Sequence, residues 1–400
     1  MNSITESGIK NITPREWIIS LPLVWAFSGQ LVNSSSYKTM VILSTLSILI
    51  SCWSYGYKEI IKNITRNKWL QLISLMLITT IAYKEYNVSS SNGELRAYAT
   101  MLVFFISLPK QLANKLFNNL HWLLLISSIF MLIYVTLNTY YWSIPRALWD
   151  INPIPYTTIS ASVAISSACG FFMSNKNNFR KISLIAFTLS LNCVLIGLSR
   201  GPLLALLCSL VIVTVFIFYR NKMLMRNRLL SIITIIALSI SFNSSHLIER
   251  LKNTENSISM IQKGGSDTSI GARLNLWNAS IHSIFEKPIF GLGNKEQSYR
   301  EELAKIGTIN QDTAKWEHYH NQYLNTLVKK GFVGFALLIL LLLYPITQLR
   351  KLDTLPASIV LGVLSTICVA GITDIPIEHT QTLIMFMALI SLSLLQETLD

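Results

Sequence analysis

Charged residues are scarce in this sequence. Of 400 residues only 13% are Asp, Glu, Lys or Arg, whereas 51% are hydrophobic. Soluble globular proteins carry about 25% charged residues, so this composition excludes an ordinary soluble domain and favours apolar side chains that face lipid. Basic residues outnumber acidic ones by 33 to 20. In a soluble protein that surplus would suggest nucleic acid or an acidic partner, but the membrane interpretation comes first and we expect no nucleic-acid partner.

Cysteine is also rare, and the common catalytic motifs are missing. The five cysteines lie in apolar stretches without a CxxC pair, which favours core residues over a disulfide framework or a zinc site. The sequence has no Walker loop, no dinucleotide-binding glycine motif, no GxSxG motif and no run of metal ligands. We therefore expect neither a cofactor nor a metal.

Twelve stretches are candidate membrane spans. A spanning helix needs about 20 mostly apolar residues. The stretches that come close to this are residues 17–35, 38–56, 69–84, 96–110, 118–138, 154–174, 182–198, 201–219, 229–243, 331–348, 355–372 and 380–396. We therefore predict an all-α polytopic membrane protein with about 12 transmembrane helices. The first stretch lies far from Met1 and no small-residue cleavage site follows it, so we expect no removed signal peptide.

Basic residues alternate between the two sides of the predicted membrane. Cytoplasmic segments of membrane proteins are rich in Lys and Arg. One set of connecting segments holds Lys10, Arg15, Lys58, Lys62, Arg66, Lys68, Lys110, Lys115, Lys176, Arg180, Lys181, Arg220, Lys222, Arg226, Arg228, Arg350 and Lys351. The opposite short segments hold only Lys38, Lys84, Arg96, Arg146 and Arg200. We expect the first set and both termini to face the cytoplasm, so the net charge of +13 is mostly a topology signal.

One connecting segment is much longer than the others. Residues 244–330 leave the membrane on the outer side and contain helical patterns without a repeat. Long structured excursions of this kind are commonly functional. The sequence thus divides into nine spans in residues 1–243, a large helical outer loop in residues 244–330 and three spans in residues 331–400.

Arg200 lies where two apolar stretches meet almost without a linker. Pro202 suits the first turn of the following helix, whose free backbone N–H groups favour an anion. The planar fork of an arginine beside such a helix start can hold two oxygens of a phosphate or pyrophosphate. The alternative is an arginine that extends to lipid headgroups.

Arg273 lies in the first turn of an expected amphipathic helix. Apolar residues recur at helical spacing between residues 269 and 285, namely Leu274, Trp277, Ile281, Ile284 and Phe285. This pattern predicts a helix on the membrane side of the loop, ended by Pro288 and the following glycines. Arg273 is either a functional residue or an ordinary interfacial arginine.

Two histidines lie at the start of the next helical pattern. We expect His320 on the inward face of a helix that enters the membrane, together with Leu324, Leu327 and Val328, and we expect this helix to end at Gly331. A histidine there is a candidate general base near neutral pH. His318 and His320 could instead bind a metal, although no third ligand has diagnostic spacing, or His320 could be structural.

Two acidic residues lie in the expected outer turn between the last two spans. Asp374 and Glu378 are close enough in sequence to share this turn. They could orient a base or bind sugar hydroxyls, and the alternative is an ordinary solvated turn.

Several outer-side motifs follow one another in a characteristic order. They are the Leu-Ser-Arg-Gly turn at Arg200, the Gly-Ala-Arg-Leu helix at Arg273, the turn from Pro288 to Gly293, the His320-Asn321 pair and the segment from Lys330 to Gly334. In this order and placement the sequence resembles the O-antigen ligase and polymerase superfamily, most strongly over residues 195–345. The runs S-I-G-A-R-L and H-Y-H-N-Q-Y look most similar to enterobacterial O-antigen ligases.

The resemblance implies an inverting, metal-independent glycosyltransferase with a GT-C-like membrane fold and a large periplasmic loop. Such an enzyme lies in the bacterial inner membrane, surrounded by membrane lipids, with its active site facing the periplasm. It transfers a finished O-antigen chain from undecaprenyl diphosphate to a sugar hydroxyl of the lipid A-core oligosaccharide. By the same resemblance, Arg200 and Arg273 hold the diphosphate and His320 activates the acceptor hydroxyl. Possible further site residues are His318, Asn321, Asp374 and Glu378.

Three other functions are compatible with this layout. A polysaccharide polymerase of the same superfamily shares the donor chemistry but uses another lipid-linked glycan as acceptor. A protein O-oligosaccharyltransferase usually has a longer C-terminal soluble part than this chain. A lipid-glycan transporter, which belongs to a different class, often has inverted repeats and interrupted midplane helices, and the sequence has no convincing internal repeat.

Overall fold

All regular secondary structure is helical in the part of the chain that the computed structural model describes, residues 12–87, 91–221, 226–262 and 268–396. The α-helices are α1 (Pro14–Ala26), α2 (Thr39–Tyr55), α3 (Tyr57–Arg66), α4 (Lys68–Asn87), α5 (Asn92–Ser107), α6 (Lys110–Asn118), α7 (Leu120–Thr136), α8 (Pro153–Met173), α9 (Asn177–Ile196), α10 (Arg200–Asn221), α11 (Arg226–Phe242), α12 (Ser244–Gln262), α13 (Ser269–Glu286), α14 (Lys295–Lys305), α15 (Gln311–Ala314), α16 (Gln322–Thr347), α17 (Thr354–Ala370) and α18 (Thr380–Leu394). Short 3-10 helices lie at Gly29–Leu31, Ser36–Lys38, Arg146–Leu148 and Leu349–Lys351, and a π-helical turn at Leu137–Tyr141 extends α7.

Six helical segments of the described chain are long and apolar enough to cross a membrane. They are Ser36–Tyr55, Leu120–Tyr141, Pro153–Met173, Asn177–Ile196, Arg200–Arg220 and Gln322–Lys351. The helices α17 and α18 are apolar but shorter. The protein is therefore a multi-pass membrane protein, as the composition predicts. Each of the twelve predicted spans overlaps an α-helix, although the first, residues 17–35, extends well beyond the end of α1 at Ala26. The number of crossings and the GT-C-like subclass stay predictions.

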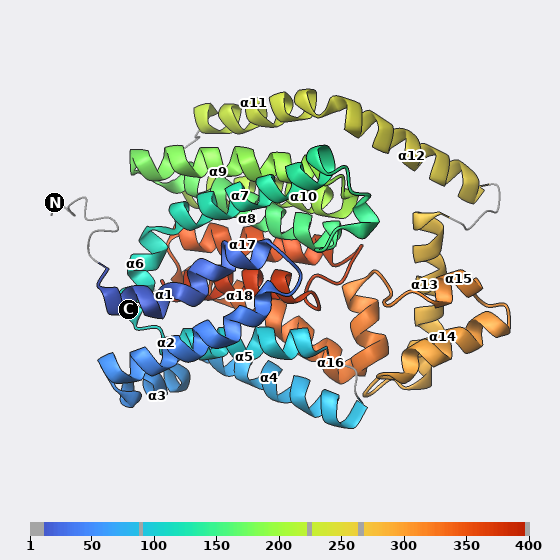
Figure 1. Cartoon of the computed structure of the whole chain (residues 1–400), viewed down its shortest axis with the longest axis horizontal. Coiled ribbons are helices and arrows are strands. Elements are labelled where there is room, and N and C mark those ends of the chain that lie inside the picture. The colour runs from blue at the N-terminus through green and yellow to red at the C-terminus, as the bar shows by residue number, and fades with distance from the viewer. Residues whose placement is uncertain (1–11, 88–90, 222–225, 263–267, 397–400) are drawn as a thin grey trace.

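Helix α8 forms the centre of the bundle. Nearly all of its residues are buried, and it packs against α7, α9, α10, α17 and α18. Its many small residues, such as Ala161, Ala164 and Ala168, let neighbouring helices approach closely. The approach of α17 is so close that a Cβ atom on Gly362 would lie 2.7 Å from Ile165. Figure 1 shows the surrounding helices running roughly along the long axis of the molecule.

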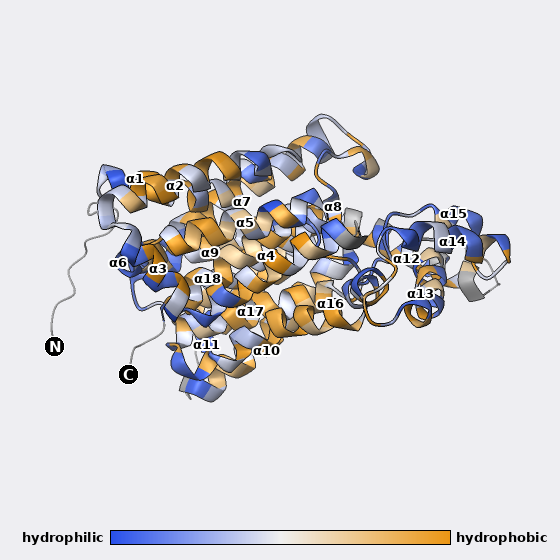
Figure 2. Cartoon of the chain, turned by 90° about the horizontal axis from the view of Figure 1, so that it is seen from below, coloured by the Kyte–Doolittle hydropathy of each residue, from blue (hydrophilic) through white to orange (hydrophobic). Residues whose placement is uncertain are grey.

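The predicted loop folds into its own helical module at one end of the bundle. Helices α12 to α15 lie at this end in Figure 1, and Figure 2 shows that many of their residues are hydrophilic while the bundle is largely hydrophobic. The module has a small core that includes Leu276, Ala279, Leu303, Tyr319 and Val328. The domain division proposed from the sequence is consistent with this arrangement and stays a prediction.

The predicted amphipathic helix is present as α13, which runs across the ends of the bundle helices in Figure 1. The hydroxyl of Thr268 caps it by accepting a hydrogen bond from the backbone N–H of Gly271 at 3.1 Å. The predicted apolar face divides in two. Trp277 and Ile284 pack on the core of the module, whereas three other apolar side chains, those of Leu274, Ile281 and Phe285, are exposed.

A glycine turn joins the module to α16. The turn at residues 288–293 lies against a kink in α16 at Gly331, where the backbone has φ 61° and ψ −165°. Leu292 N donates to Val328 O across this contact at 2.7 Å. A Cβ atom on Gly331 would lie only 2.3 Å from Ile289 O, so the close approach requires glycine. The helix end predicted at Gly331 corresponds to this kink, beyond which α16 continues.

Candidate functional site

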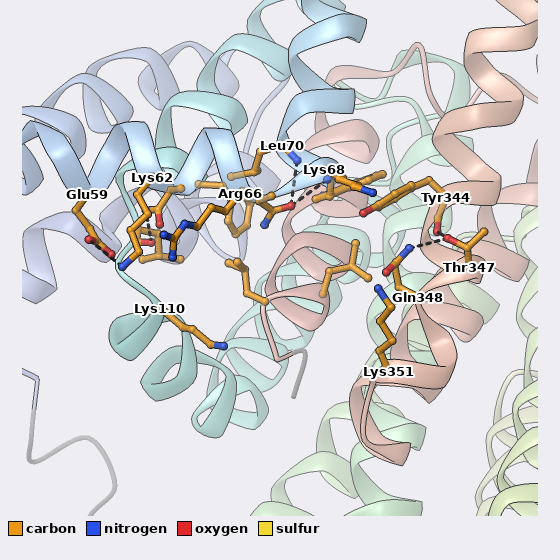
Figure 3. Close-up of a pocket in the computed structure, with 17 residues that line it drawn as sticks. Glu59, Lys62, Arg66, Lys68, Leu70, Lys110, Tyr344, Thr347, Gln348 and Lys351 are labelled. Atoms are coloured by element: carbon orange, nitrogen blue, oxygen red, sulfur yellow. Dashed lines mark hydrogen bonds and ion pairs between the residues drawn. The ribbon is translucent and has the colours of Figure 1, made fainter. Parts of the chain in front are cut away.

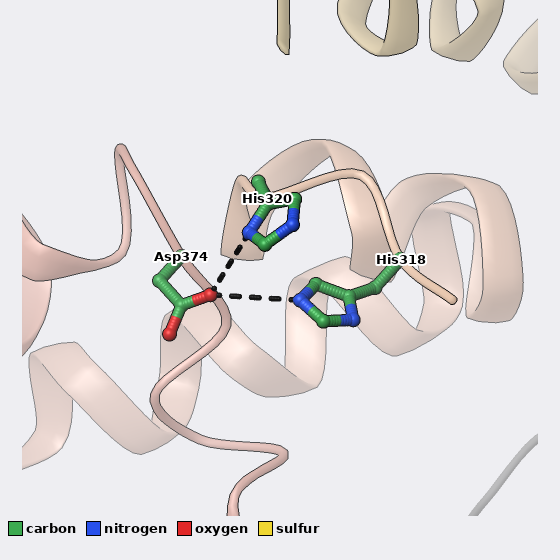
Figure 4. A group of neighbouring side chains, drawn as sticks. All are labelled: His318, His320 and Asp374. Atoms are coloured by element: carbon green, nitrogen blue, oxygen red, sulfur yellow. Dashed lines mark hydrogen bonds and ion pairs between the residues drawn. The ribbon is translucent and has the colours of Figure 1, made fainter. Parts of the chain in front are cut away.

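A buried carboxylate gathers three histidines. Asp374 lies in the turn between α17 and α18 and is only 2% exposed. Its Oδ1 atom lies 3.3 Å from His320 Nδ1 and 3.6 Å from His318 Nε2. Its Oδ2 atom lies 3.2 Å from His379 Nε2. Figure 4 shows His318 and His320 converging on one oxygen of Asp374, so the alternative of a solvated turn is wrong for this residue.

His320 lies just before α16 and not on its inward face as predicted. Its φ of 46° places the backbone in the left-handed region, which is costly for a residue with a Cβ atom. The helix begins after Asn321, whose Oδ1 accepts hydrogen bonds from Tyr323 N at 3.0 Å and Leu324 N at 3.1 Å. The predicted helix starts two residues too early, at His320 instead of Gln322, because Asn321 caps the helix. The resulting bend leaves the imidazole of His320 beside Asp374.

The start of α16 is tied to the turn that holds Asp374. Asn321 Nδ2 donates to Ile372 O at 3.2 Å. Gln322 N donates to Gly371 O at 2.7 Å, and Gln322 Oε1 accepts from Ile377 N at 2.9 Å. These bonds support a positioning role for Asn321, since they hold the segment carrying His320 against the acidic turn.

Burial and mutual contact set the protonation of this group. Burial alone would raise the pKa of Asp374, but His379, His318 and His320 hold it well below its usual range. Burial lowers the pKa of His320, and Arg273 acts in the same direction, while Asp374 opposes both. Burial alone would also lower the pKa of His379, yet Asp374 raises it overall. Asp374 is therefore ionised at neutral pH, and His320 is mostly neutral.

The contact with Asp374 decides which nitrogen of His320 is free. An ionised carboxylate can only accept hydrogen bonds, so the proton between the two residues must belong to His320 Nδ1. The lone pair of Nε2 is then available to take a proton, which is the arrangement of a general base oriented by a carboxylate. The Trp316 ring contacts the imidazole edge-on, with 4.9 Å between ring centroids, and limits its rotation.

Four arginines lie within electrostatic range beside this group. Arg200 at the start of α10 interacts with Arg250 of α12 and Arg273 of α13. Arg146 interacts with Arg250 and Arg200. The Nε atom of each of the four is buried and has no hydrogen-bond partner among the described residues. We term these residues the arginine cluster. Four like charges in partly buried positions repel one another, so the cluster favours an anion.

Arg273 links the arginine cluster to the histidines. Burial lowers its pKa, Asp374 opposes that effect, and Arg250 reinforces it. Burial, with Arg250 and Arg200, lowers the pKa of Arg146 to about 10. Both guanidinium groups therefore stay cationic at neutral pH. Because Arg273 acts on Asp374 as well as on Arg250, the anion-attracting groups and the base form one continuous site.

Glu378 belongs to a neighbouring ion-pair network. Asn325 Nδ2 donates to its Oε1 atom at 2.6 Å, and Lys329 Nζ lies 3.8 Å from its Oε2 atom. Lys329 also lies 4.0 Å from Glu296. Glu378 is thus neutralised by a lysine of α16, and its solvated-turn alternative is wrong because its side chain is only 14% exposed. Its contacts favour a structural role between α16 and the last turn.

The histidine group also has the composition of a metal site. His318, His320 and Asp374 each offer one ligand atom, and these atoms lie within 4.8 Å of one another. Sequence spacing did not reveal the third ligand because Asp374 is 54 residues away from His320. Imidazole and carboxylate ligands suit a divalent transition metal, whereas the positive charge of Arg273 opposes one. A metal-free site stays our prediction and requires a direct test.

Sequence reasoning missed three residues of this site. Arg146 was among the few basic residues on the predicted outer side, and that scarcity was the available signal. Arg250 lies in a polar helix with other charges, and His379 follows an acidic turn, so neither had a distinguishing pattern. All three are identified only by their spatial neighbours.

Comparison with known proteins concerns the same part of the chain. Residues 185–339 match the O-antigen ligase family. This segment includes Arg200, Arg273 and His320. An uncharacterized protein from Haemophilus influenzae (strain ATCC 51907 / DSM 11121 / KW20 / Rd) is 28% identical over 197 residues, which cover 48% of this chain and 49% of that protein. The chain thus matches about half the length of this curated relative.

Proposed function

We propose that this protein is an O-antigen ligase. It transfers the O-antigen polysaccharide from undecaprenyl diphosphate to a sugar hydroxyl of lipid A-core at the periplasmic face of the inner membrane. The observation that carries the proposal is the neutral His320 oriented by Asp374 directly beside the arginine cluster. The match of residues 185–339 to the O-antigen ligase family supports the same reaction.

The arginine cluster binds the donor through its diphosphate. Its buried Nε atoms lack partners among the described residues, so a diphosphate supplies the acceptors that the protein does not. When the glycosidic bond breaks, negative charge develops on the leaving phosphate oxygen, and preorganised guanidinium groups stabilise that charge. Fixed cations can do this without a metal ion.

His320 activates the acceptor. The sugar hydroxyl attacks the anomeric carbon of the donor while His320 Nε2 takes its proton, and Asp374 stabilises the imidazolium that forms. The bond between the anomeric carbon and the diphosphate oxygen breaks, and undecaprenyl diphosphate leaves with the electron pair. Attack from the face opposite the leaving group inverts the anomeric configuration.

The test is a reaction of the purified full-length protein with lipid-linked O-antigen and lipid A-core. We expect wild type to form the capped glycolipid and His320→Ala to be slower by about 10²- to 10⁴-fold, the usual contribution of a general base. His282→Ala is the matched control, because His282 is an exposed histidine of α13 outside the site. Equal activity of the His320 variant and wild type would remove His320 from the reaction. Absence of any glycoside product with wild type would favour the transporter alternative.

The acceptor class is tested in a deletion strain. If the protein is a ligase, the deletion strain should make lipopolysaccharide without capped chains and should accumulate lipid-linked polymer. A core that carries a single repeat unit would instead identify a polymerase.

Metal dependence is tested on the purified protein by chelation and metal analysis. Activity that requires a divalent ion would contradict the metal-free reaction at His318, His320 and Asp374.

The two arginines found only in the structure have a test of their own. We expect Arg146→Gln and Arg250→Gln each to lower kcat/KM by about 10²-fold, the typical loss when one charge-stabilising donor is removed. Lys252→Gln removes an exposed charge two residues from Arg250 and is the control. Wild-type kcat/KM in both arginine variants would exclude them from donor binding.

A further inference from the structure

A cavity lies at the opposite end of the bundle from the histidines. It has a volume of about 730 Å³ and is lined by the ends of α3, α5, α16 and α18 and the starts of α4 and α6. Figure 3 shows its basic side chains. Helix α16 begins beside His320 and ends at this cavity. At about 1.5 Å per residue its length separates the two places by roughly 35 Å. The cavity therefore lies outside the proposed active site.

Basic residues far outnumber acidic residues in the lining of the cavity. Its lining contains one acidic residue, Glu59, and five basic residues, Lys62, Arg66, Lys68, Lys110 and Lys351. Glu59 already forms an ion pair with Lys62, with 3.5 Å between Glu59 Oε2 and Lys62 Nζ. Arg66, Lys68 and Lys110 form no ion pair with any other described residue. An anion with more than one negative oxygen would relieve this repulsion.

Part of the lining of the same cavity is apolar, and we term this part the apolar wall. Leu70, Phe105 and Leu394 belong to it and are almost completely buried, whereas Tyr344 and Leu395 are only partly buried and offer contact surface. A free anion gains nothing from such a wall, whereas an acyl chain does. The cavity thus combines a basic rim with an apolar interior, which matches a phosphate headgroup attached to hydrocarbon.

The position of α3 indicates that the cavity lies at a membrane surface. This helix is amphipathic: Tyr57 and Ile61 are exposed, and charged side chains occupy its other face. Asn63 Nδ2 fixes it to the end of α5 by donating to Ile106 O at 2.9 Å and Leu108 O at 3.2 Å. Basic pockets between spanning helices on the cytoplasmic side are sites for anionic lipid headgroups.

We propose that this cavity binds the phosphate headgroup of an anionic phospholipid, with one acyl chain against the apolar wall. The rim cations Arg66, Lys68 and Lys110 contact the phosphate. The predicted topology places the site in the cytoplasmic leaflet, on the side opposite the arginine cluster. The lipid is a bound structural ligand and takes no part in glycosyl transfer.

The test compares ligands on the purified full-length protein by native mass spectrometry and thermal unfolding. The probes are dioctanoyl phosphatidylglycerol, dioctanoyl phosphatidylcholine and inorganic phosphate. We expect phosphatidylglycerol to bind and raise Tm, and the two other probes to do neither at equal concentration. The variant Arg66→Gln/Lys68→Gln/Lys110→Gln should bind phosphatidylglycerol roughly 100-fold more weakly, because each of the three basic residues near an anionic lipid contributes about fivefold.

Two further variants keep the result interpretable. Lys176→Gln/Arg180→Gln/Lys181→Gln removes the same charge from another segment of the same predicted side and should bind as wild type does. Thr347→Trp fills the cavity without changing its charge, so it should also lose phosphatidylglycerol binding. It therefore tests the proposal even if the basic variant does not fold. Equal weakening in the control variant, binding of inorganic phosphate as strong as that of phosphatidylglycerol, or unchanged binding by Thr347→Trp would each overturn the proposal.

Discussion

Asp374 controls the orientation and the pKa of His320. It holds His320 Nδ1 at 3.3 Å and leaves Nε2 free. It also raises the pKa of His320 against the lowering effect of burial. Asp374 is therefore a positioning residue whose removal should change both the rate and its pH dependence, whereas a merely structural residue would change only the amount of folded protein.

The pH profile of Asp374→Asn tests this role. In wild type the neutral imidazole is active, so activity should be lost as pH falls through the His320 pKa, which burial places below its ordinary value of 6.5. Without the carboxylate this pKa falls further, so the acidic limb should move to lower pH. The maximal rate should fall by about 10²- to 10⁴-fold, because the imidazole is no longer oriented. The measurement is kcat/KM from pH 4.5 to 8. An acidic limb that is unchanged or moves upward would contradict the assignment.

Residue type and local sequence pattern were sufficient to predict some residues of the site but not the contacts between them. Arg200, Arg273 and His320 were candidates because a cation beside a helix start and a histidine on an outer segment have recognisable chemistry. Asp374 remained ambiguous, since a solvated and a buried carboxylate have the same sequence. The difference arises from the packing of the last turn on the start of α16, which depends on contacts between distant residues.

At the scale of elements, helices were predictable and their ends were less so. Long apolar stretches require helices in a membrane, because every backbone polar group must be satisfied internally, and each predicted span is helical. The end of a helix depends on one or two side chains. Asn321 caps α16 through two backbone hydrogen bonds, and this excludes His320 from a helix that its apolar spacing had seemed to include.

The kink of α16 at Gly331 predicts that this position requires glycine. Gly331→Ala should lower Tm strongly, because its Cβ atom would lie 2.3 Å from Ile289 O and its φ of 61° already disfavours alanine. Gly307→Ala is the matched control, since Gly307 has φ 80° but nothing within 4 Å of the added atom. It should lose only about 1–2 kcal/mol of stability, the cost of a left-handed backbone. Thermal unfolding in detergent measures both variants, and equal losses would show that the contact with the 288–293 turn is unimportant.

At the scale of the whole molecule, the two charged sites lie at opposite ends of the bundle. The arginine cluster is built from the 3-10 helix Arg146–Leu148, α10 and the module, at the end where α16 begins. The phospholipid cavity is built where α16 ends. The net charge of +13 identifies neither site, because it does not show which basic residues lie together. Arg66, Lys68 and Lys110 of the cavity belong to the basic segments that predict topology, whereas the arginine cluster lies outside them.

The orientation that separates these ends across a membrane can be measured by cysteine labelling. In a chain with its five native cysteines replaced, Ser298→Cys on α14 and Lys181→Cys on α9 introduce exposed thiols on opposite predicted sides. The basic segments should be cytoplasmic under the positive-inside rule. A membrane-impermeant maleimide should therefore label position 298 in intact spheroplasts and position 181 only after the membrane is permeabilised. The reverse pattern would place the arginine cluster in the cytoplasm, where no finished O-antigen is transferred, and would contradict the proposed reaction together with the predicted topology.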